Sequence, residues 1–373
     1  MKKIKVRALL GSWQGYQEIV NYPPKGIEYQ GISKGTSQGT YYESKKMKEF
    51  LSRIIQKIKI SRMIFVKPGN YDLIHSSRGI IPLNKKPWVM DVEHAFSFTG
   101  LDPKLLKRKG IKKFVERKLA QKNCKALLCH CEASKKSFFK FLDCKKFKDK
   151  IDVLYPASHI VPIKKKSHKK IRILCILSLF RHKAGLQVLK AFSELEKKYN
   201  NIELWMRSDV PKELRKKYNS KNIRYMPYFG EILSREKLLE DIYGNCDIFL
   251  YPTFCDSFGY SQIDALVAGL PIIGTNMFAV PEVVEEGKNG LIIEIPGYDV
   301  NSGIQEHLIT NMTKDEEERF VSDMVKAIEK LVKNKKLREK MGKESFKLVS
   351  EGKFSIKERN KKLRKVYEDA LRK

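Results

Sequence analysis

The stretch from Cys246 to Ile295, CDIFLYPTFCDSFGYSQIDALVAGLPIIGTNMFAVPEVVEEGKNGLIIEI, decides the fold. An apolar run that ends at Tyr251 predicts a buried strand, and the run at 271–275 predicts a second one. Between the two runs, apolar residues repeat at the spacing of one helix face, so a helix is expected after Gly259. Strand, helix and strand in this order are typical of a parallel sheet with crossover helices.

Two carboxylates lie close to the predicted helix start in this stretch. A helix that begins between 257 and 260 directs backbone amides outward, and such amides attract an anion. Asp256 precedes the helix, and Asp264 lies on the side of the helix away from Ile263 and Leu266, so both carboxylates are expected at one mouth. Together they suit a ligand that has both hydroxyls and phosphate. The alternative is that Asp256 caps the helix and Asp264 is a solvated surface residue.

Alternation of strands and helices extends over the rest of the chain and predicts two domains. In the first part, a loop is expected from about 11 to 42, an amphipathic helix at 43–60, and strands at 3–10, 63–66, 72–75 and 88–92. A second series of strands begins at 171, and the tail from 313 onward is helical. Prolines and lysines at 156–170 indicate a linker. We predict an α/β fold with two Rossmann-like, doubly wound parallel-sheet domains that face a central cleft.

The expected domain boundaries follow from the linker. The first domain takes residues 1–165 and is completed by a C-terminal helix at 355–373, and the second takes residues 166–354. A length of 373 residues is ample for two well-packed cores. No apolar run approaches the roughly 18 residues that cross a bilayer, and the N-terminus lacks the pattern of a signal peptide, so a cytoplasmic protein is expected.

Cysteine usage favours free thiols. The seven cysteines form an odd, unevenly spaced set, which fits a reducing compartment. A zinc site is the alternative for Cys124, Cys129, His130 and Cys131, but a second ligand pair at the usual interval is missing. Buried, unreactive thiols and no metal site are therefore predicted.

The formal net charge of +32 is unevenly distributed. Residues 101–150 contain seventeen basic and five acidic residues, and phenylalanines are interleaved with lysines at 135–148, KKSFFKFLDCKKFK. A basic surface with aromatic side chains would attract anionic lipid headgroups or nucleic acid. The alternative is that these lysines only form solvated helix faces. Because the sequence has no recognisable nucleic-acid module, a nucleic-acid partner is not expected.

The 246–295 stretch resembles the donor-binding signature of family 4 of the retaining GT-B glycosyltransferases, also described as glycosyl transferases group 1. That signature has Glu-Gly-Phe-Gly, a second Glu eight positions after the first, then Ala, Gly and Pro, and later Pro-Glu. The matching positions here are Asp256, Phe258, Gly259, Asp264, Ala265, Gly269, Pro271, Pro281, Glu282 and Gly290. The resemblance covers residues 171–370 clearly and the first 165 residues only loosely. Two aspartates replace the two glutamates of the family, and each shortens the side chain by one carbon.

The resemblance also implies roles for individual residues. Asp256 would bind sugar hydroxyls, Asp264 would bind the ribose, and the Phe258 and Gly259 amides would meet the diphosphate. An Arg and a Lys of the family normally neutralise the diphosphate, but a gapless alignment on Gly185 puts Leu179 and Ala184 at their positions. Lys183, with Arg181 second, is predicted to take over this role. Surface lysine and arginine without a ligand are the alternative.

In the first domain, the segment PWVMDVEHAFSF from Pro87 resembles the place where such enzymes put a histidine near the donor sugar. His94 is the candidate, with Glu93 beside it, and a structural hydrogen bond is the alternative role for a lone histidine.

The resemblance implies a retaining glycosyltransferase that uses a nucleotide-diphosphate sugar as donor substrate, without cofactor or metal, and a glycan or lipid-linked acceptor. Attachment to the inner membrane face through the basic segment at 101–150 is expected to accompany this activity. A catalytically silent GT-B relative that binds a nucleotide or acts as a scaffold is the alternative, because the two glutamates are replaced and the basic residues are displaced.

Overall fold

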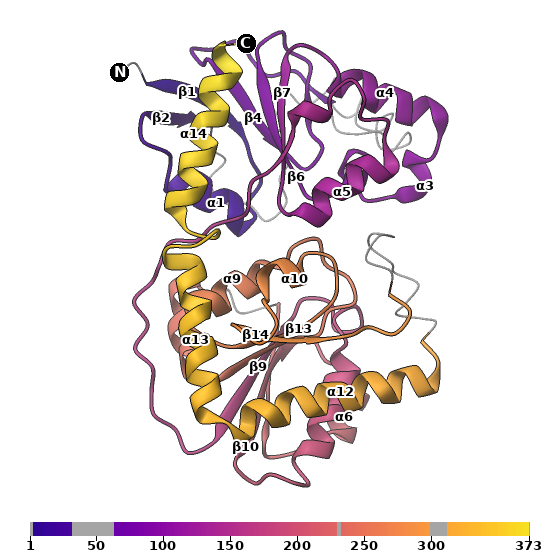
Figure 1. Ribbon diagram of the computed structural model, residues 1–373, viewed down its shortest axis with the longest axis vertical. Helices are drawn as coiled ribbons and strands as arrows, with labels where there is room; N and C mark the ends of the chain where they lie inside the picture. Colours follow the sequence, from indigo (N-terminus) through magenta and orange to yellow (C-terminus); the bar gives the residue numbers. More distant parts are fainter. Residues whose placement is uncertain (1–2, 32–62, 230–232, 299–311, 373) are drawn as a thin grey trace. The chain divides into compact units, whose positions relative to one another are not determined.

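The computed structural model describes residues 3–31, 63–229, 233–298 and 312–372. The chain divides into two compact units, drawn in Figure 1. Unit 1 is Met1–Ala157 with Ile356–Lys373, and unit 2 is Ser158–Ser355. The chain passes from unit 1 to unit 2 between Ala157 and Ser158, near the start of the segment 156–170. The sequence analysis placed this boundary at 165. The helix expected at 43–60 lies outside the described residues.

Unit 1 contains a six-stranded parallel sheet in the order β2-β1-β4-β6-β7-β8. These strands are β1 (Ile4–Leu9), β2 (Ile27–Gln30), β4 (Leu73–Ser77), β6 (Trp88–Val92), β7 (Cys124–Cys129) and β8 (Ile151–Val153). A separate parallel pair is formed by β3 (Met63–Ile64) and β5 (Ile81–Pro82). The α-helices are α1 (Gln14–Asn21), α3 (Pro103–Leu106), α4 (Lys109–Leu119), α5 (Glu132–Phe141) and α14 (Ile356–Arg372). Two single turns of 3₁₀ helix, η1 (Ala95–Thr99) and η2 (Lys148–Lys150), complete the unit.

Unit 2 contains a second six-stranded parallel sheet, in the order β11-β10-β9-β12-β13-β14. Its strands are β9 (Ile171–Leu177), β10 (Ile202–Ser208), β11 (Ile223–Met226), β12 (Ile248–Tyr251), β13 (Ile272–Thr275) and β14 (Gly290–Ile293). Its α-helices are α6 (Gly185–Leu195), α7 (Lys212–Lys217), α8 (Arg235–Lys237), α9 (Tyr260–Val267), α10 (Val280–Val283), α12 (Lys314–Lys333) and α13 (Lys335–Ser350). A π-helical turn, η3 (Leu238–Ile242), and a 3₁₀ turn, η4 (Tyr243–Asn245), lead into β12.

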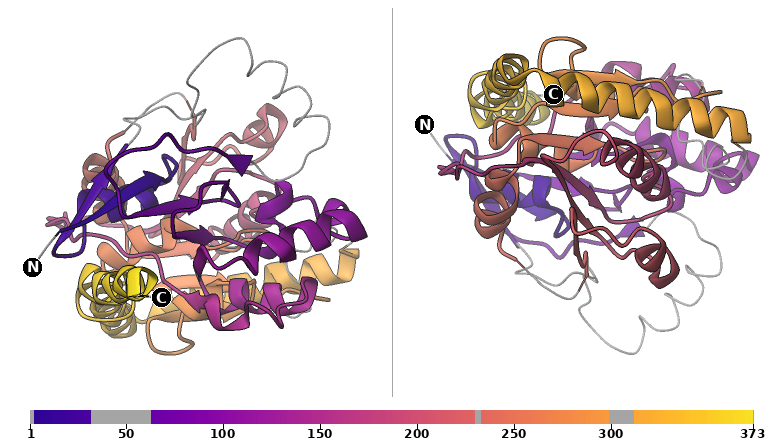
Figure 2. Two further views of the ribbon diagram at one scale, coloured as in Figure 1. Left: turned by 90° about the horizontal axis from the view of Figure 1, so that it is seen from above. Right: turned by 90° about the horizontal axis from the view of Figure 1, so that it is seen from below.

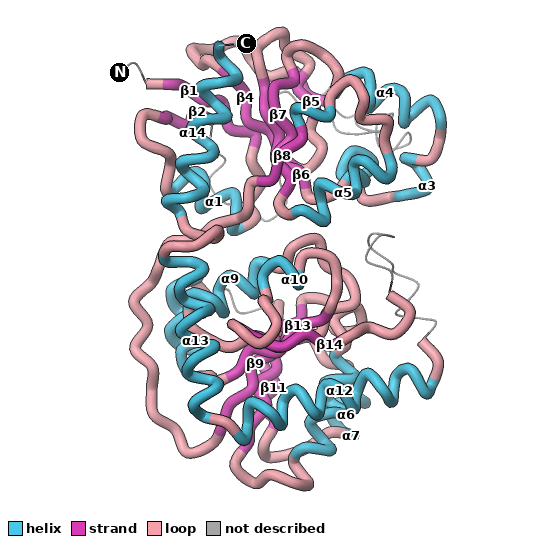
Figure 3. The backbone as a smooth tube through the Cα atoms, in the orientation of Figure 1, coloured by secondary structure: helices cyan, strands magenta, loops and turns pink. Residues whose placement is uncertain are grey.

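Helices cover both faces of the unit 2 sheet. Helix α6 packs against α12, and α9 packs against α13. Figure 1 shows the two pairs on opposite sides of the strands, and the right-hand view of Figure 2 shows α12 beside α6. Figure 3 shows the strands of the unit 2 sheet side by side. Two all-parallel sheets of this kind confirm the predicted doubly wound α/β class.

The prediction of a loop from 11 to 42 is wrong for its described part. Residues Gln14–Asn21 form α1, and Ile27–Gln30 form β2 at the edge of the sheet. The helix buries Tyr16 and Ile19, which lie three residues apart and share one face. Gln17 and Glu18 between them, and Gly15 before them, conceal this short period, so tertiary burial decides the structure here.

The C-terminal helix α14 supplies part of the core of unit 1. Leu363, Tyr367 and Ala370 pack into the same apolar cluster as β1 and α1. The Tyr367 hydroxyl lies 2.6 Å from Nδ1 of His75 and 2.8 Å from the Tyr29 hydroxyl. His75 in turn places Nε2 2.9 Å from a buried Asp91 carboxylate oxygen. The two Tyr367 contacts help to fix the position of α14 on the sheet, because His75 and Tyr29 both lose this hydroxyl if the helix moves.

We expect Tyr367→Phe to destabilise unit 1 by about 1–3 kcal/mol, because the change leaves buried polar atoms of His75 and Tyr29 without this hydroxyl. Ring packing is unchanged by the substitution, so the loss reports the hydrogen bonds alone. Urea unfolding followed by tryptophan fluorescence measures the effect. An unchanged midpoint would show that the chain of hydrogen bonds contributes nothing.

The expected aromatic surface at 135–148 is mostly absent. Helix α5 turns Phe138 into the core with 0% exposure, and Phe147 is 2% exposed. Phe141 packs against Phe96 with ring centroids 4.5 Å apart. Only Phe139 of this group is well exposed, at 50%. The segment is therefore a basic surface with one exposed phenylalanine. The helical period of α5 directs Phe138 inward, and Phe147, which follows α5, packs into the same core cluster.

Candidate functional site

The order of strands in unit 2 reverses between β9 and β12. The chain runs from β9 outward to β10 and β11, then returns to pair β12 on the other side of β9. Loops that leave β9 and β12 therefore diverge toward opposite faces of the sheet and leave a crevice at the carboxyl ends of the strands. Lys183 lies in the loop after β9, and Asp256 lies in the loop after β12. The topology thus brings together two of the residues predicted from the sequence.

Lys183 and Asp256 form an ion pair at this point. Nζ of Lys183 contacts Oδ2 of Asp256 and lies 3.2 Å from the Tyr251 hydroxyl, which donates to the same carboxylate oxygen. The side chains of Lys183 and Asp256 are 10% and 20% exposed. A cation, a carboxylate and a hydroxyl therefore meet in one largely buried cluster at the end of the sheet.

The environment of this pair controls its charge. Burial acts to raise the pKa of the Asp256 carboxyl, but the charge of Lys183 and the hydrogen bonds from Lys183 and Tyr251 outweigh burial and lower this pKa below its usual value. Burial, together with the Asp256 charge, raises the pKa of Tyr251 well above its ordinary value. At neutral pH the site thus holds a carboxylate, an ammonium and a neutral phenol.

Gly259 makes the approach of the helix start to Tyr251 possible. It precedes α9 with φ of +77°, and a Cβ at this position would lie 2.1 Å from the Tyr251 hydroxyl oxygen. Phe258 is 1% exposed, and its amide lies 3.4 Å from Oδ1 of Asp256. The sequence analysis assigned the Phe258 amide to a diphosphate, whereas in the structure it faces the carboxylate of its own loop.

Asp264 is buried beside a cation of its own. Nε of Arg235 lies 2.9 Å from Oδ1 of Asp264, and both side chains are 8% exposed. The guanidinium also donates to the Ser158 hydroxyl and lies 3.3 Å from the ring nitrogens of His159. The alternative that Asp264 is a solvated surface residue is wrong, because Arg235 holds it within the fold.

Comparison with known proteins matches most of unit 2 to a family. Residues 158–319 match the family "glycosyl transferases group 1". Unit 2 carries a glycosyl transferases group 1 domain. The crystal structure of HepE from Anabaena in complex with UDP-glucose is similar with a TM-score of 0.64 and 12% identity, over 98% of this chain and 99% of HepE. This likeness confirms the predicted GT-B fold.

Two curated relatives align with parts of the chain. An uncharacterized 41.2 kDa protein in the cps region of Klebsiella pneumoniae is 27% identical over 61% of this chain, and the match spans 66% of that protein. The UDP-N-acetylglucosamine–peptide N-acetylglucosaminyltransferase GtfA subunit of Streptococcus parasanguinis is 37% identical over 19% of this chain and 14% of the subunit. The chain thus spans less than two thirds of either relative.

Two further residues predicted from the sequence take no part in the Lys183–Asp256 ion pair. One lies in unit 2 and the other in unit 1. Arg181 is exposed in the loop two residues before Lys183. His94 belongs to unit 1, where it is fully buried and its Nδ1 accepts the Phe96 amide at the start of η1. Burial lowers the pKa of His94 to about 3, so the ring is neutral at pH 7. The capping contact accounts for the histidine without a ligand.

Sequence reasoning missed Tyr251 and Arg235 in the group 1 domain. Tyr251 occupies the last position of an apolar strand, where the pattern shows only burial. Arg235 begins α8, which lies far from Asp264 along the chain, so no local spacing links the two. The available signal for Tyr251 was Gly259, because a glycine directly before a helix often marks a close approach of the backbone to another residue. In the structure that residue is Tyr251.

Within the described ranges, the structure contains no cluster of three or more metal-ligating side chains. All seven cysteines are free, in agreement with the sequence analysis, and six of them are buried. Burial raises the pKa of Cys124 and of Cys129 to about 12.

Among the helices that the structure describes, none has the length and apolar character needed to cross a membrane.

Proposed function

We propose that this chain is a glycosyltransferase that moves a sugar from a nucleotide-diphosphate sugar to a glycan or lipid-linked acceptor with retention of anomeric configuration. The observation that carries the proposal is the Lys183–Asp256 pair at the point where the strand order of unit 2 reverses. Open α/β sheets bind nucleotides at this position. The UDP-glucose complex of HepE and the UDP-N-acetylglucosamine in the name of the GtfA subunit support a uridine nucleotide as donor.

Lys183 is proposed to stabilise the departing diphosphate. The transition state of glycosyl transfer gathers negative charge on the leaving phosphate, and a fixed cation in a largely buried site stabilises that charge most effectively. The start of α9, beside Gly259, adds the positive end of a helix dipole. Arg181, exposed in the same loop, supplies a second cation if the loop closes over the phosphates. The acceptor hydroxyl then attacks from the face that the diphosphate leaves.

Asp256 is proposed to bind hydroxyls of the donor sugar. In the structure its Oδ2 is held by Lys183 and Tyr251, which sets the direction of the carboxylate. When the diphosphate draws on Lys183, Asp256 can accept hydrogen bonds from sugar hydroxyls in its place. Each charged group keeps a polar partner when the donor binds, because the donor brings phosphate to the cation and hydroxyls to the carboxylate.

Asp264 and His94 are proposed to complete the donor contacts. Asp264 would receive the ribose hydroxyls in exchange for part of its contact with Arg235. The role of His94 toward the donor sugar is retained from the resemblance alone, because its ring is fully buried and its Nδ1 accepts the Phe96 amide. A divalent metal is not required by this scheme, since Lys183 and Arg181 supply the positive charge.

The proposal is tested by incubating the full chain with a panel of UDP-, GDP- and ADP-sugars and measuring release of the nucleotide diphosphate, with EDTA present. Turnover of at least one donor is expected, and it should increase when a glycan or lipid-linked acceptor is added. Saturable binding without turnover of any donor would favour a catalytically silent relative. Two observations keep this second function open. Asp256 is already paired with Lys183, and Asp264 is already paired with Arg235.

Gly259→Ala should lower kcat/KM by at least about tenfold, because the added Cβ meets the Tyr251 hydroxyl and the positive φ costs about 1–2 kcal/mol. Gly287→Ala is the matched control: its φ is +73°, and no atom lies within 4 Å of the added Cβ. Steady-state kinetics with the preferred donor compares the two. Equal losses in both variants would show that backbone strain, not the contact with Tyr251, limits position 259.

Peripheral attachment to a membrane is proposed as well, through the lysines at 101–150. Exposed lysines attract anionic headgroups, and each contributes about 1 kcal/mol near the surface. The structure leaves only Phe139 of the aromatic group exposed for insertion. The apolar part of a membrane contact must therefore come mainly from elsewhere in the chain.

A further inference from the structure

A pocket of about 750 Å³ lies at the amino ends of the strands of unit 2. Asp247 directly precedes β12 and Pro271 directly precedes β13, and both line the pocket. Lys183 and Asp256 follow the carboxyl ends of β9 and β12. Because the strands are parallel, the pocket and the proposed donor site lie at opposite edges of the same sheet, so both can be occupied at once.

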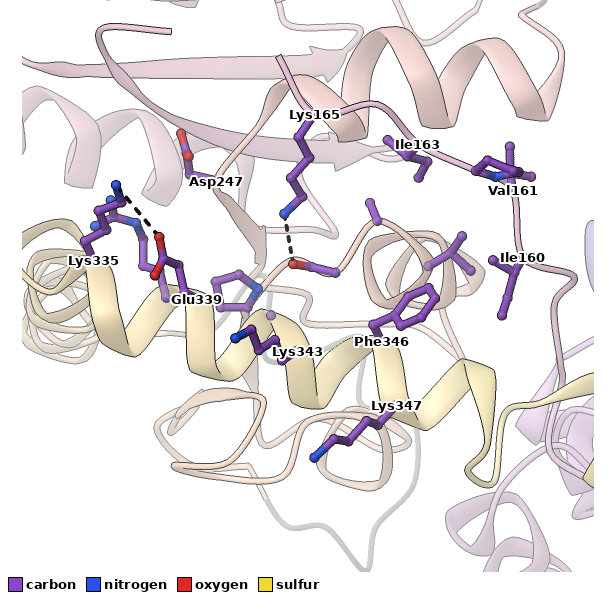
Figure 4. Close-up of a pocket in the computed structure, with 17 residues that line it drawn as sticks. Ile160, Val161, Ile163, Lys165, Asp247, Lys335, Glu339, Lys343, Phe346 and Lys347 are labelled. Carbon is purple, nitrogen blue, oxygen red and sulfur yellow. Dashed lines mark hydrogen bonds and ion pairs between the residues drawn. The ribbon is translucent and has the colours of Figure 1, made fainter. Parts of the chain in front are cut away.

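The walls of the pocket are apolar. Residues 160–163 of the segment before β9 form one wall, the end of α9 with Val267 and Ala268 forms the floor, and α13 forms the other wall. Figure 4 shows Ile160 and Ile163 on the first wall and Phe346 on the second. Ile160 is 42% exposed and Phe346 is 39% exposed. Two large apolar side chains thus remain in contact with water at this one place, which marks a surface for an apolar partner.

Cationic side chains surround these walls. The rim has five cations and two carboxylates, a local excess of 5 − 2 = +3, from Lys165, Lys335, Arg338, Lys343, Lys347, Asp247 and Glu339. Both carboxylates and one further cation have partners. Asp247 accepts from Nε2 of His168 at 2.7 Å, Glu339 lies 3.8 Å from Lys335, and Lys347 donates to Glu344 at 2.6 Å. Lys165 donates to the Gly269 carbonyl at 3.3 Å and so reaches across the pocket (Figure 4).

Lys343 and Phe346 are the most informative pair of this rim. They lie three residues apart on α13, so one side chain is next to the other on the helix surface. Lys343 has no ion-pair partner among the described residues, and its exposed charge stands beside the exposed phenylalanine ring. An apolar side chain flanked by lysines is typical of protein surfaces that enter the headgroup region of a bilayer.

We propose that this pocket, which we call the α13 pocket, binds an anionic phospholipid of a membrane surface. The headgroup phosphate would lie against Lys343, and the glycerol and upper acyl chain would lie between Ile160 and Phe346. A soluble polyanion would bind the cations but would leave both apolar side chains in water. The combination of cations and exposed apolar side chains therefore favours an amphiphile. The segment at 101–150 supplies charge but little apolar surface, and the α13 pocket supplies both. This inference does not depend on the proposed catalytic activity.

The test is flotation of the full chain with vesicles of phosphatidylcholine alone and of phosphatidylcholine mixed with phosphatidylglycerol. Wild-type protein should float only with the mixed vesicles. Lys343→Glu, Phe346→Ser and Ile160→Ser should each weaken this binding at least about fivefold, the factor expected from losing about 1 kcal/mol. Two apolar positions on opposite walls keep the test informative if one variant fails to fold. Thermal unfolding identifies such a variant.

Matched controls separate the α13 pocket from general charge and from unit 1. Lys216→Glu on α7 changes the net charge by the same amount as Lys343→Glu at an exposed residue that does not line the pocket. Phe139→Ser removes the exposed phenylalanine of α5. Both controls should retain binding within about twofold of the wild type.

Three results would overturn the proposal. The first is equal loss in Lys216→Glu and Lys343→Glu, since general charge would then explain binding. The second is wild-type affinity in both Phe346→Ser and Ile160→Ser. The third is binding of a single-stranded oligonucleotide that anionic vesicles fail to displace, which would assign the cations to nucleic acid. Nucleotide-sugar turnover is expected to be unchanged in every α13 pocket variant, so failure of the two proposals can be told apart.

Discussion

Lys183→Met is expected to lower kcat by about 10²–10³-fold, with a smaller change in KM, because the substitution removes the cation nearest to the proposed leaving group. Methionine keeps much of the aliphatic length of lysine, so packing in the loop before α6 changes little. Single-turnover kinetics with saturating donor measures the chemical step directly. The matched control is Lys190→Met on α6, where the lysine pairs with Glu317 on α12 and lies outside the proposed site.

The same substitution changes the response of stability to pH. In the wild type, the lowered pKa of Asp256 means that its contribution to stability is present above the unfolded value of about 4 and is lost as pH falls through the folded value. In Lys183→Met, burial remains without the compensating charge, so the pKa of Asp256 should rise above the unfolded value. The free energy of unfolding of the variant should then approach that of the wild type as pH falls from 7 toward 4. A difference that stays constant with pH would show that Lys183 does not control Asp256.

Arg235→Met is expected to lower the free energy of unfolding by about 3 kcal/mol, because it leaves the carboxylate of Asp264 buried without its cation. Both side chains are 8% exposed, so solvent cannot take over the role of the guanidinium. Urea unfolding of the full chain measures the change. Arg319→Met, at an exposed position of α12, serves as the control and should change stability by less than about 0.5 kcal/mol.

A double variant distinguishes the ion pair from other contacts of Arg235. Asp264→Leu in the Arg235→Met background removes the unpaired carboxylate and should restore most of the lost stability. If the double variant is as unstable as Arg235→Met alone, the contacts of Arg235 with Ser158 and His159 account for the loss. The ion pair with Asp264 would then have a minor role.

Much of the fold followed from local patterns in the sequence. The apolar run that ends at Tyr251 identified a central strand of unit 2, and the series predicted to begin at 171 does begin there, with β9. The tail predicted to be helical from 313 onward begins with α12, whose N-terminus has a capping box at Thr313. Helix α1 was missed because its buried face contains only a few large side chains. Phe138 and Phe147 were read as surface residues because the residues around them are charged, although the helical period and the local fold bury them.

The candidate site was predictable only where a known signature covered it. Asp256, Gly259 and Asp264 were found through their spacing within one stretch, and Lys183 through its place after a strand. The cation beside Asp264 was not predictable, since Arg235 reaches it from a different helix by tertiary contact. Likewise, the capping role of His94 depends on the backbone geometry of η1, which a lone histidine after a strand does not reveal.

The most direct test of the central claim is equilibrium binding of UDP to the full chain by isothermal titration calorimetry. The account predicts one saturable site in the wild type, binding at least about tenfold weaker in Lys183→Met, and unchanged affinity in Lys190→Met, because a charged hydrogen bond to phosphate contributes roughly 1.5–3 kcal/mol. No binding of UDP, or equal affinity in the wild type and Lys183→Met, would contradict it.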